Sequence, residues 1–227
     1  MKFIVFGLGN YGSSLATKLS SLGHEVIGVD NKIDVVERFK ETITHTIALD
    51  AANREAMMSL PLKDVDAAIV TPGEIPGTTI MVAALLKQLG CGRIICRAIS
   101  PLQQTVLESM NIKEFVYPEA DAAERMAYKL DLKGTIDSYK ISDNYQLLEV
   151  EVPQRYIGTK VSDVNFVGEH QVQLITVIRP EEEKNIFGAV HVVRKVMGII
   201  SSDIELTKGD SMIIFGEVKK LEDFIEF

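Results

Sequence analysis

The chain has few of the groups that metal and redox sites use. It has two cysteines, Cys91 and Cys96, and their spacing is that of neither a Cys-x-x-Cys redox pair nor half of a metal site. We expect both to be buried, reduced thiols. The four histidines are scattered, and no two of them have the helical spacing of metal ligands.

Basic residues are also in the minority. The chain has 24 Lys and Arg against 32 Asp and Glu, a net charge of −8. Nucleic-acid-binding proteins need clustered positive charge, so we expect no nucleic-acid partner. No apolar stretch approaches the roughly 18–20 residues that cross a bilayer. Because the first apolar run begins at Lys2, we also expect no signal peptide and a cytoplasmic location.

Signatures of common catalytic sites are missing as well. There is no Gly-x-Ser-x-Gly motif, no Walker lysine and no His-Glu zinc motif. A dehydrogenase would need a second domain with a proton donor, and the second half of the chain offers no obvious one. The sequence therefore favours a protein that is not an enzyme, with an NAD(H)-dependent oxidoreductase as the alternative.

The most informative motif that is present lies near the start. Between an apolar run and a helical pattern the chain reads Gly7-Leu8-Gly9-Asn10-Tyr11-Gly12, and Asp30 ends the next apolar run. This is the G-x-G-x-x-G arrangement of dinucleotide-binding proteins, with the acidic residue that accepts hydrogen bonds from ribose. We expect Gly7 to form the tight turn, Gly9 to admit a pyrophosphate, and Gly12 to let the helix pack closely. A tight turn that binds no ligand is the alternative.

Short apolar runs alternate with helical patterns through the first half. The expected strands are Lys2–Phe6, Glu25–Val29, His45–Leu49, Ala67–Val70, Ile94–Arg97 and Glu114–Val116. The expected helices are Tyr11–Leu22, Ile33–Lys40, Asn53–Leu60, Ile75–Leu89 and Pro101–Met110. This alternation indicates an α/β fold with a doubly wound, Rossmann-type parallel sheet in the strand order 3-2-1-4-5-6. Ser100 and Gln103 predict a capping box on the last of these helices.

Further candidates follow the strands at the carboxyl edge, where ligands of this fold bind. Asp50 and Ala51 follow the third strand, beside the expected position of an adenine ring. The alternative is that Asp50 or Asn53 merely caps the next helix. Thr71 and Gly73 follow the fourth strand.

Arg97 ends the fifth strand at the same edge. Its guanidinium is well placed there to pair with a phosphate. The alternative is an ion pair with Glu74 or Glu119.

After residue 118 the pattern changes. A helical pattern extends from Ala120 to about Leu132, and the polar stretch Asp137–Asn144 is expected to be a linker. Alternating apolar runs follow, and a helical pattern ends the chain. We expect a small α+β domain in which residues 180–185 form an exposed acidic turn. The expected domains are 1–118 and 139–227, joined by 119–138.

The helix expected at Ile75–Leu89 is apolar around too much of its circumference, with seven consecutive apolar residues from Ile80 to Leu86. One face would cover the sheet, and the remainder must be hidden elsewhere. We expect a second copy of the chain to cover it. Cover by the C-terminal domain or the crossover helix is the alternative.

The order of several motifs resembles that of one family. They are Gly7–Gly12, Gly23–Val26, Ala48–Asn53, Val106–Glu108, Val116–Asp121, Glu124–Ala127, Glu149–Val152, Ile157–Gly158, Val161–Asp163 and Lys208–Asp210. Together they resemble regulator of potassium conductance (RCK) subunits of the Trk/Ktr type. These are cytosolic regulatory partners of bacterial potassium channels and transporters.

The resemblance implies a nucleotide-binding RCK-N domain, a crossover helix, and a small regulatory RCK-C domain. It implies dimers that combine into tetramers or octameric rings beneath a membrane potassium channel or transporter subunit. ATP, ADP or NAD(H) would occupy the cleft, and Glu119 matches a family acid that binds a divalent or monovalent cation near the phosphates. The alternative for Glu119 is that it stabilises the positive end of the helix that follows. Many Ktr-type subunits have an arginine where this chain has Asn10, so this departure favours NAD(H) or AMP-like ligands over ATP.

Overall fold

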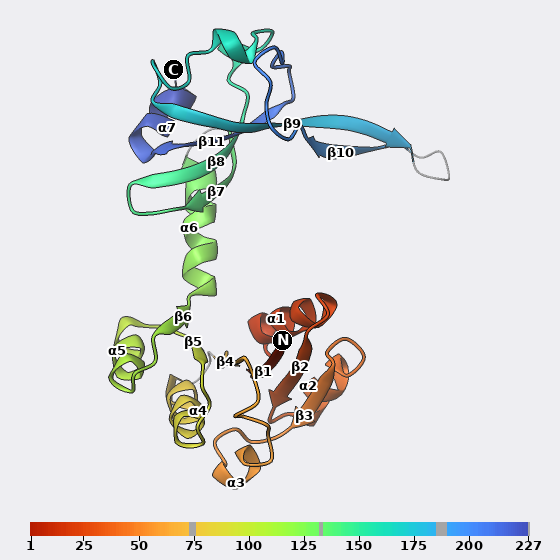
Figure 1. The fold of residues 1–227 in the computed structure, drawn as a ribbon, viewed down its shortest axis with the longest axis vertical. Coiled ribbons are helices and arrows are strands. Elements are labelled where there is room, and N and C mark those ends of the chain that lie inside the picture. The colour runs from red at the N-terminus through yellow and green to blue at the C-terminus, as the bar shows by residue number, and fades with distance from the viewer. Residues whose placement is uncertain (73–75, 132–133, 185–189, 227) are drawn as a thin grey trace. The chain divides into compact units, whose positions relative to one another are not determined.

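A computed structural model describes residues 1–72, 76–131, 134–184 and 190–226. The chain divides into two compact units, Met1–Glu119 and Ala120–Phe227 (Figure 1). No helix within these described ranges is long and apolar enough to cross a membrane.

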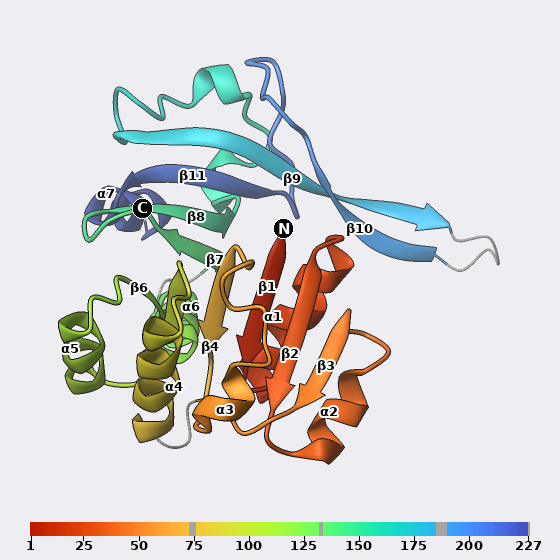
Figure 2. The ribbon, with the colours of Figure 1, turned by 60° about the horizontal axis from the view of Figure 1, so that its bottom comes forward.

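The first unit alternates strands and helices. Its strands are β1 (Lys2–Phe6), β2 (Glu25–Asp30), β3 (His45–Ala48), β4 (Ala67–Val70), β5 (Ile94–Arg97) and β6 (Glu114–Val116). Its helices are α1 (Asn10–Ser21), α2 (Ile33–Phe39), α3 (Arg54–Met57), α4 (Pro76–Gln88) and α5 (Pro101–Ser109). The strands form one parallel sheet in the order β3-β2-β1-β4-β5-β6, which confirms the predicted topology. The order from β3 to β4 can be followed in Figure 2.

Both faces of this sheet are covered, because alternate residues of a strand point to opposite faces. Ile4 and Phe6 of β1 belong to one apolar cluster with Leu86 of α4. Val5, between them, belongs to another cluster with Ala16 of α1. This two-sided burial explains why the strands are continuously apolar.

The capping prediction for α5 is confirmed in part. The Ser100 hydroxyl accepts a hydrogen bond from the Gln103 N–H at 3.2 Å. The Gln103 side-chain oxygen, however, accepts from the N–H of Ile99 at 2.9 Å, one residue before the cap. Helix α3 is shorter than predicted: it ends at Met57, whereas the predicted helix ended at Leu60.

The second unit is built on an antiparallel sheet. Helix α6 (Pro118–Asp131) belongs to this unit from residue 120 onward. The remaining elements are β7 (Thr135–Lys140), β8 (Tyr145–Glu151), the 3-10 helices η1 (Gln154–Tyr156) and η2 (Val161–Asp163), β9 (Val172–Lys184), β10 (Val190–Val196), β11 (Ser211–Glu217) and α7 (Val218–Glu226). The strand order is β10-β9-β11-β8-β7. Leu221 and Phe224 of α7 are fully buried against one face of the sheet.

Two predictions for this unit are wrong. Residues 137–140 of the expected linker lie in β7, where Ser138 is buried and Asp137 pairs with Arg125 of α6. Hydrogen bonds from Arg125 lower the pKa of Asp137. Residues 180–184 of the expected acidic turn continue β9, which pairs with the unpredicted strand β10. The alternation of apolar and polar residues fails there because both faces of this ribbon are exposed to solvent.

Candidate functional site

The glycine motif forms a turn that the fold itself requires. Gly7 has φ +89°, a conformation that side chains rarely adopt, and its N–H donates to Val29 O at 2.7 Å. The Thr71 hydroxyl lies 2.7 Å from Gly7 O and 2.9 Å from Phe6 O. A Cβ on Gly12 would lie 1.9 Å from Gly7 O, so α1 packs against the turn only with glycine there.

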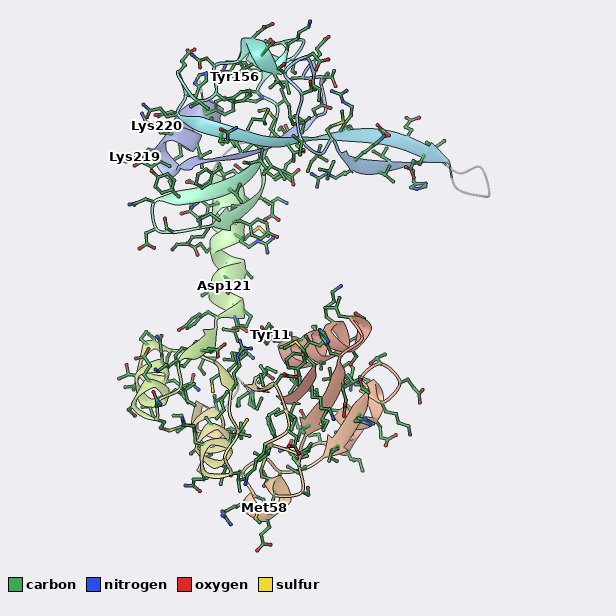
Figure 3. All side chains as sticks on the ribbon, viewed as in Figure 1. Tyr11, Met58, Asp121, Tyr156, Lys219 and Lys220 are labelled. Atoms are coloured by element: carbon green, nitrogen blue, oxygen red, sulfur yellow. The ribbon has the colours of Figure 1, made fainter. Side chains whose placement is uncertain are left out.

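Gly9 differs from its two neighbours in the motif. It is the residue before α1, with φ −66° and ψ −173°, which any residue adopts. A Cβ at this position would have no atom within 4 Å. The fold therefore does not need glycine at position 9. Because Gly9 has no side chain, the space in front of the first turn of α1 stays open. Tyr11 belongs to this turn (Figure 3). The N–H groups of a first helical turn have no acceptors within the helix, so they can bind a ligand.

The Asp30 carboxylate lies beside this turn. Its Oδ2 accepts a hydrogen bond from the N–H of Leu8 at 2.8 Å, and its Oδ1 accepts from the N–H of Lys32 at 3.0 Å. These contacts fix the orientation of the carboxylate at the end of β2. Each oxygen retains acceptor capacity, because a carboxylate offers about four lone-pair sites.

A cleft of about 620 Å³ lies at this edge of the sheet. The predicted site residues that line it are Gly7, Leu8, Gly9, Asn10, Tyr11, Asp30, Asp50, Ala51, Thr71, Arg97 and Glu119. Gly12 does not line the cleft, because it faces the Gly7 carbonyl instead. The predicted Gly73, and Glu74 beside it, lie outside the described residues.

The cleft also has lining residues that sequence reasoning missed. Lys32, Val35 and Thr78 are three of them. Lys32 follows Asp30 by two residues, at the carboxyl end of β2, so its position relative to that strand was a usable signal. Thr78 belongs to α4 and reaches the cleft only through the packing of that helix, which no local pattern reveals.

Asp50 and Asn53 have separate tasks. Asn53 caps α3, and its Oδ1 accepts from the N–H groups of Glu55 at 2.9 Å and Ala56 at 3.2 Å. Asp50 instead accepts from the N–H of Ala52 at 2.9 Å within the loop. The carboxylate of Asp50 therefore lines the cleft and does not cap the helix.

Arg97 pairs within the unit. Its guanidinium forms an ion pair with Glu119 and donates to the backbone oxygen of Thr71 at 3.2 Å. The side chain of Arg97 is 19% exposed and that of Glu119 is 65% exposed. The predicted alternative of an Arg97–Glu119 pair is thus the one that the structure contains. It leaves the phosphate role of Arg97 as a prediction.

The described part of the cleft has chemistry suited to binding. Its charged side chains are Asp30, Lys32, Asp50, Arg97 and Glu119.

Cys96, next to Arg97, is fully buried, and burial raises its pKa to about 12, so it stays a thiol at neutral pH. Cys91 is buried too, as predicted. No group of three or more metal-binding side chains occurs among the described residues.

The glycine turn, the acidic residue and the doubly wound sheet define a Rossmann-type nucleotide-binding fold. Comparison with known proteins supports this assignment. Residues 3–118 match the TrkA-N domain family, and the chain belongs to that family. It is 27% identical to the Ktr system potassium uptake protein C of Bacillus subtilis (strain 168) over 181 residues, which cover 80% of this chain and 82% of that protein.

Solved structures share the fold across both units. The crystal structure of the GsuK RCK domain matches with a TM-score of 0.65 at 16% identity and covers 100% of this chain and 48% of that chain. The GsuK channel bound to NAD matches with a TM-score of 0.65 at 15% identity and covers 98% of this chain and 38% of that chain. This chain thus spans about half or less of those two chains. At such identities the likeness establishes the fold alone.

Proposed function

We propose that the protein is a nucleotide-binding regulatory subunit of a membrane potassium channel or transporter. The observation that carries the binding part is Gly9, the one glycine of the motif that the fold does not require. The similarity to the Ktr potassium uptake protein C over four-fifths of the chain supports the potassium part. In this proposal the protein works at the cytoplasmic face of the membrane, held there by its partner.

The ligand that we propose is an adenine nucleotide, either ATP or ADP or the dinucleotide NAD(H). Asp30 would accept hydrogen bonds from ribose hydroxyls, and the first turn of α1 would face the phosphates. The cleft has three carboxylates against two cationic side chains among its described lining. Because this balance opposes a densely charged anion, and because Asn10 replaces an arginine, NAD(H) fits better than ATP. A cation at Glu119 would shift the balance toward ATP.

Regulation would follow from a difference in affinity. A ligand shifts an equilibrium between two shapes only as far as it binds one shape more tightly. We propose that the protein forms dimers that assemble into a tetramer or an octameric ring, whose shape the nucleotide selects. Met81 of α4, which is 55% exposed, belongs to the apolar helix surface that a second copy would cover.

The test has two parts. A ligand that binds the native state raises the melting temperature, so thermal unfolding is measured with NAD, NADH, ADP and ATP. Potassium uptake is then measured in cells that contain the membrane partner, with the wild type and with a variant that no longer binds nucleotide. We expect a shift with at least one ligand and altered uptake in the variant. Uptake that is equal in both would reject the regulatory role.

An NAD(H)-dependent oxidoreductase is the second candidate, because the Rossmann fold also serves such enzymes. It predicts oxidation or reduction of the cofactor with small carbonyl or hydroxy substrates, and turnover in that assay would displace our proposal. A third possibility is a nucleotide sensor for another transporter. Co-purification of the tagged protein with a membrane protein other than a potassium pore would favour that reading.

A further inference from the structure

The turn between β1 and α1 is anchored to the ends of both neighbouring strands. Strand β1 lies between β2 and β4 in the sheet (Figure 2). The N–H of Gly7 donates to the oxygen of Val29 in β2 at 2.7 Å. The oxygen of Phe6, in the same peptide group, accepts from the N–H of Thr71, directly after β4, at 2.9 Å. Because the N–H and C=O of a trans peptide point in opposite directions, this group is held from both sides.

The next peptide group, Gly7–Leu8, is held by two side chains. The Thr71 hydroxyl lies 2.7 Å from the Gly7 oxygen. The N–H of Leu8 donates to Asp30 Oδ2 at 2.8 Å. Gly7 has φ +89° and no Cβ, so steric contacts alone do not stop this group from rotating. Thr71 and Asp30 therefore fix the opposite ends of one peptide group.

The Thr71 hydroxyl has no free proton to offer a ligand. It lies 2.9 Å from the Phe6 oxygen as well as 2.7 Å from the Gly7 oxygen, and a hydroxyl has a single proton. Thr71 is 3% exposed. A Cβ on Gly12 would lie only 2.4 Å from its Oγ1, so the start of α1 packs directly against the hydroxyl. Thr71 thus lines the cleft without a side-chain donor for a phosphate.

We propose that Thr71 is a positioning residue of the nucleotide site. Its hydroxyl orients the Gly7–Leu8 peptide group, and the N–H of Leu8 in turn orients the Asp30 carboxylate toward ribose. This inference rests on the proposed function, which gives Asp30 its role in ribose binding. Without the hydroxyl, the Gly7 oxygen loses a donor and the peptide group can rotate away from Asp30. The carboxylate then keeps its contact with the N–H of Lys32 at 3.0 Å, and one contact fixes its orientation less firmly than two.

The contact between Thr71 and Arg97 is independent of this hydroxyl. Arg97 Nη1 donates to the backbone oxygen of Thr71 at 3.2 Å. A substitution of the Thr71 side chain leaves that oxygen in place. Thr71→Ser keeps the hydroxyl and Thr71→Ala removes it, whereas both lose the methyl group. The difference between these two variants therefore isolates the hydroxyl.

Hydrogen exchange, followed by NMR, tests the first step without a ligand. We expect the N–H of Leu8 to exchange roughly tenfold faster in Thr71→Ala than in Thr71→Ser, because local opening becomes easier. Thr176→Ala is the matched control: Thr176 is buried in the second unit, and its hydroxyl donates to the Gly198 oxygen at 2.8 Å. It should leave exchange at Leu8 unchanged. Thr71→Val, which keeps the volume of threonine, replaces Thr71→Ala if that variant does not fold.

Titration calorimetry with ADP and dideoxy-ADP tests the second step. Dideoxy-ADP lacks the ribose hydroxyls that Asp30 would bind. We expect Thr71→Ala to bind ADP about fivefold more weakly than Thr71→Ser does, which is the effect of roughly one hydrogen bond. The affinity for dideoxy-ADP should be the same in both variants. A merely structural role would weaken the binding of both ligands equally.

The outcomes separate this inference from the proposed function. Equal exchange at Leu8 in Thr71→Ser and Thr71→Ala would overturn the positioning role, and so would an equal loss of affinity for ADP and dideoxy-ADP. Wild-type protein that binds ADP, with no difference between the two Thr71 variants, would reject the positioning role alone. Wild-type protein that binds none of ADP, ATP, NAD and NADH would reject the proposed function and this role with it.

Discussion

The guanidinium of Arg97 and the carboxylate of Glu119 form an ion pair at the wall of the cleft beside the glycine turn. Arg97 Nε donates to Glu119 Oε2 at 3.3 Å, in addition to a shorter contact through Nη2. The pair joins the end of β5 to the start of α6, and both residues belong to the first unit. If a ligand phosphate binds at Arg97, as predicted, we expect Glu119 to compete with it for the guanidinium.

The first prediction follows from this competition. Glu119→Gln removes a negative charge from the cleft and frees Arg97, so nucleotides with a terminal phosphate should bind more tightly. We expect a gain of about threefold to tenfold, which matches the roughly 1 kcal/mol upper range of partly exposed ion pairs. Calorimetric titration with ADP and ATP, without divalent cations, measures it.

Glu114→Gln is the matched control, because Glu114 pairs with Arg93 on the same sheet but does not line the cleft. It should leave nucleotide affinity unchanged. Weaker binding by Glu119→Gln, with or without added Mg²⁺, would mean that Glu119 assists the ligand and does not compete with it.

The second prediction concerns Asp30. Asp30→Ala removes the carboxylate proposed to bind ribose, so the thermal shift caused by ribose-bearing ligands should disappear. The ligand-free protein should also lose stability by roughly 1–2 kcal/mol, since the N–H of Leu8 loses its acceptor. Thermal unfolding with and without nucleotide separates the two effects. Asp34→Ala, an exposed carboxylate on α2, serves as the control. An undiminished ligand shift in Asp30→Ala would remove Asp30 from the site.

Much of the first unit could be predicted because its signals are local and redundant. Buried strands such as β4, Ala67–Val70, are short and wholly apolar, and their ends were predicted to the residue. Gly7 could be assigned to a tight turn because its positive φ is a conformation that glycine adopts readily and other residues rarely do. Asp30 was identified by its spacing from the glycines, which reflects the length of one βαβ unit.

The remainder depends on contacts that no local pattern encodes. The partner of Arg97 could be narrowed to Glu74 or Glu119 from the sequence, and only the three-dimensional arrangement shows the pair with Glu119. The strand β7 looked like a linker because Asp137 and Ser138 are polar. Asp137 is satisfied there by Arg125 from another element. Lys195 of β10 and Glu181 of β9 likewise form an ion pair that is visible only once the two strands are paired.

The third prediction separates the glycines of the motif by what each one does. A Cβ at Gly12 would overlap Gly7 O at 1.9 Å and Thr71 Oγ1 at 2.4 Å, so Gly12→Ala should destabilise the fold by about 2–4 kcal/mol. Gly9→Ala should leave stability within roughly 0.5 kcal/mol, since its Cβ would meet no atom and its backbone suits alanine.

Nucleotide binding should be weakened by Gly9→Ala even though that substitution leaves stability nearly unchanged. Gly9→Ala should weaken it at least tenfold, because the new methyl group occupies the approach to the first turn of α1. Urea unfolding and thermal shift on the same samples measure both quantities. If Gly9→Ala binds nucleotide as the wild type does, the open space before α1 is not where the phosphates lie.

The fourth prediction concerns a buried ion pair in the second unit. The Asp210 carboxylate is fully buried and accepts from Arg179 Nε at 2.9 Å and Nη2 at 2.7 Å, and from the N–H of Thr207 at 2.8 Å. Burial acts to raise the pKa of Asp210, but these hydrogen bonds outweigh it, and the pKa is lowered. Asp210→Asn leaves the Arg179 charge uncompensated, so we expect a loss of roughly 3 kcal/mol at pH 7.

The pH dependence gives this prediction its sign. Because the pKa of Asp210 is lower in the folded protein than in the unfolded chain, the unfolded chain binds more protons at low pH. The stabilisation is therefore fully present above the ordinary aspartate pKa of about 3.9 and is lost as the pH falls through the lower folded value. The difference in unfolding free energy between wild type and Asp210→Asn should shrink below about pH 4, as urea unfolding at several pH values would measure. Glu181→Gln, in the exposed pair with Lys195, should show a difference below roughly 1 kcal/mol. A constant gap for Asp210→Asn from pH 7 to pH 3 would show that its effect comes from packing and not from charge.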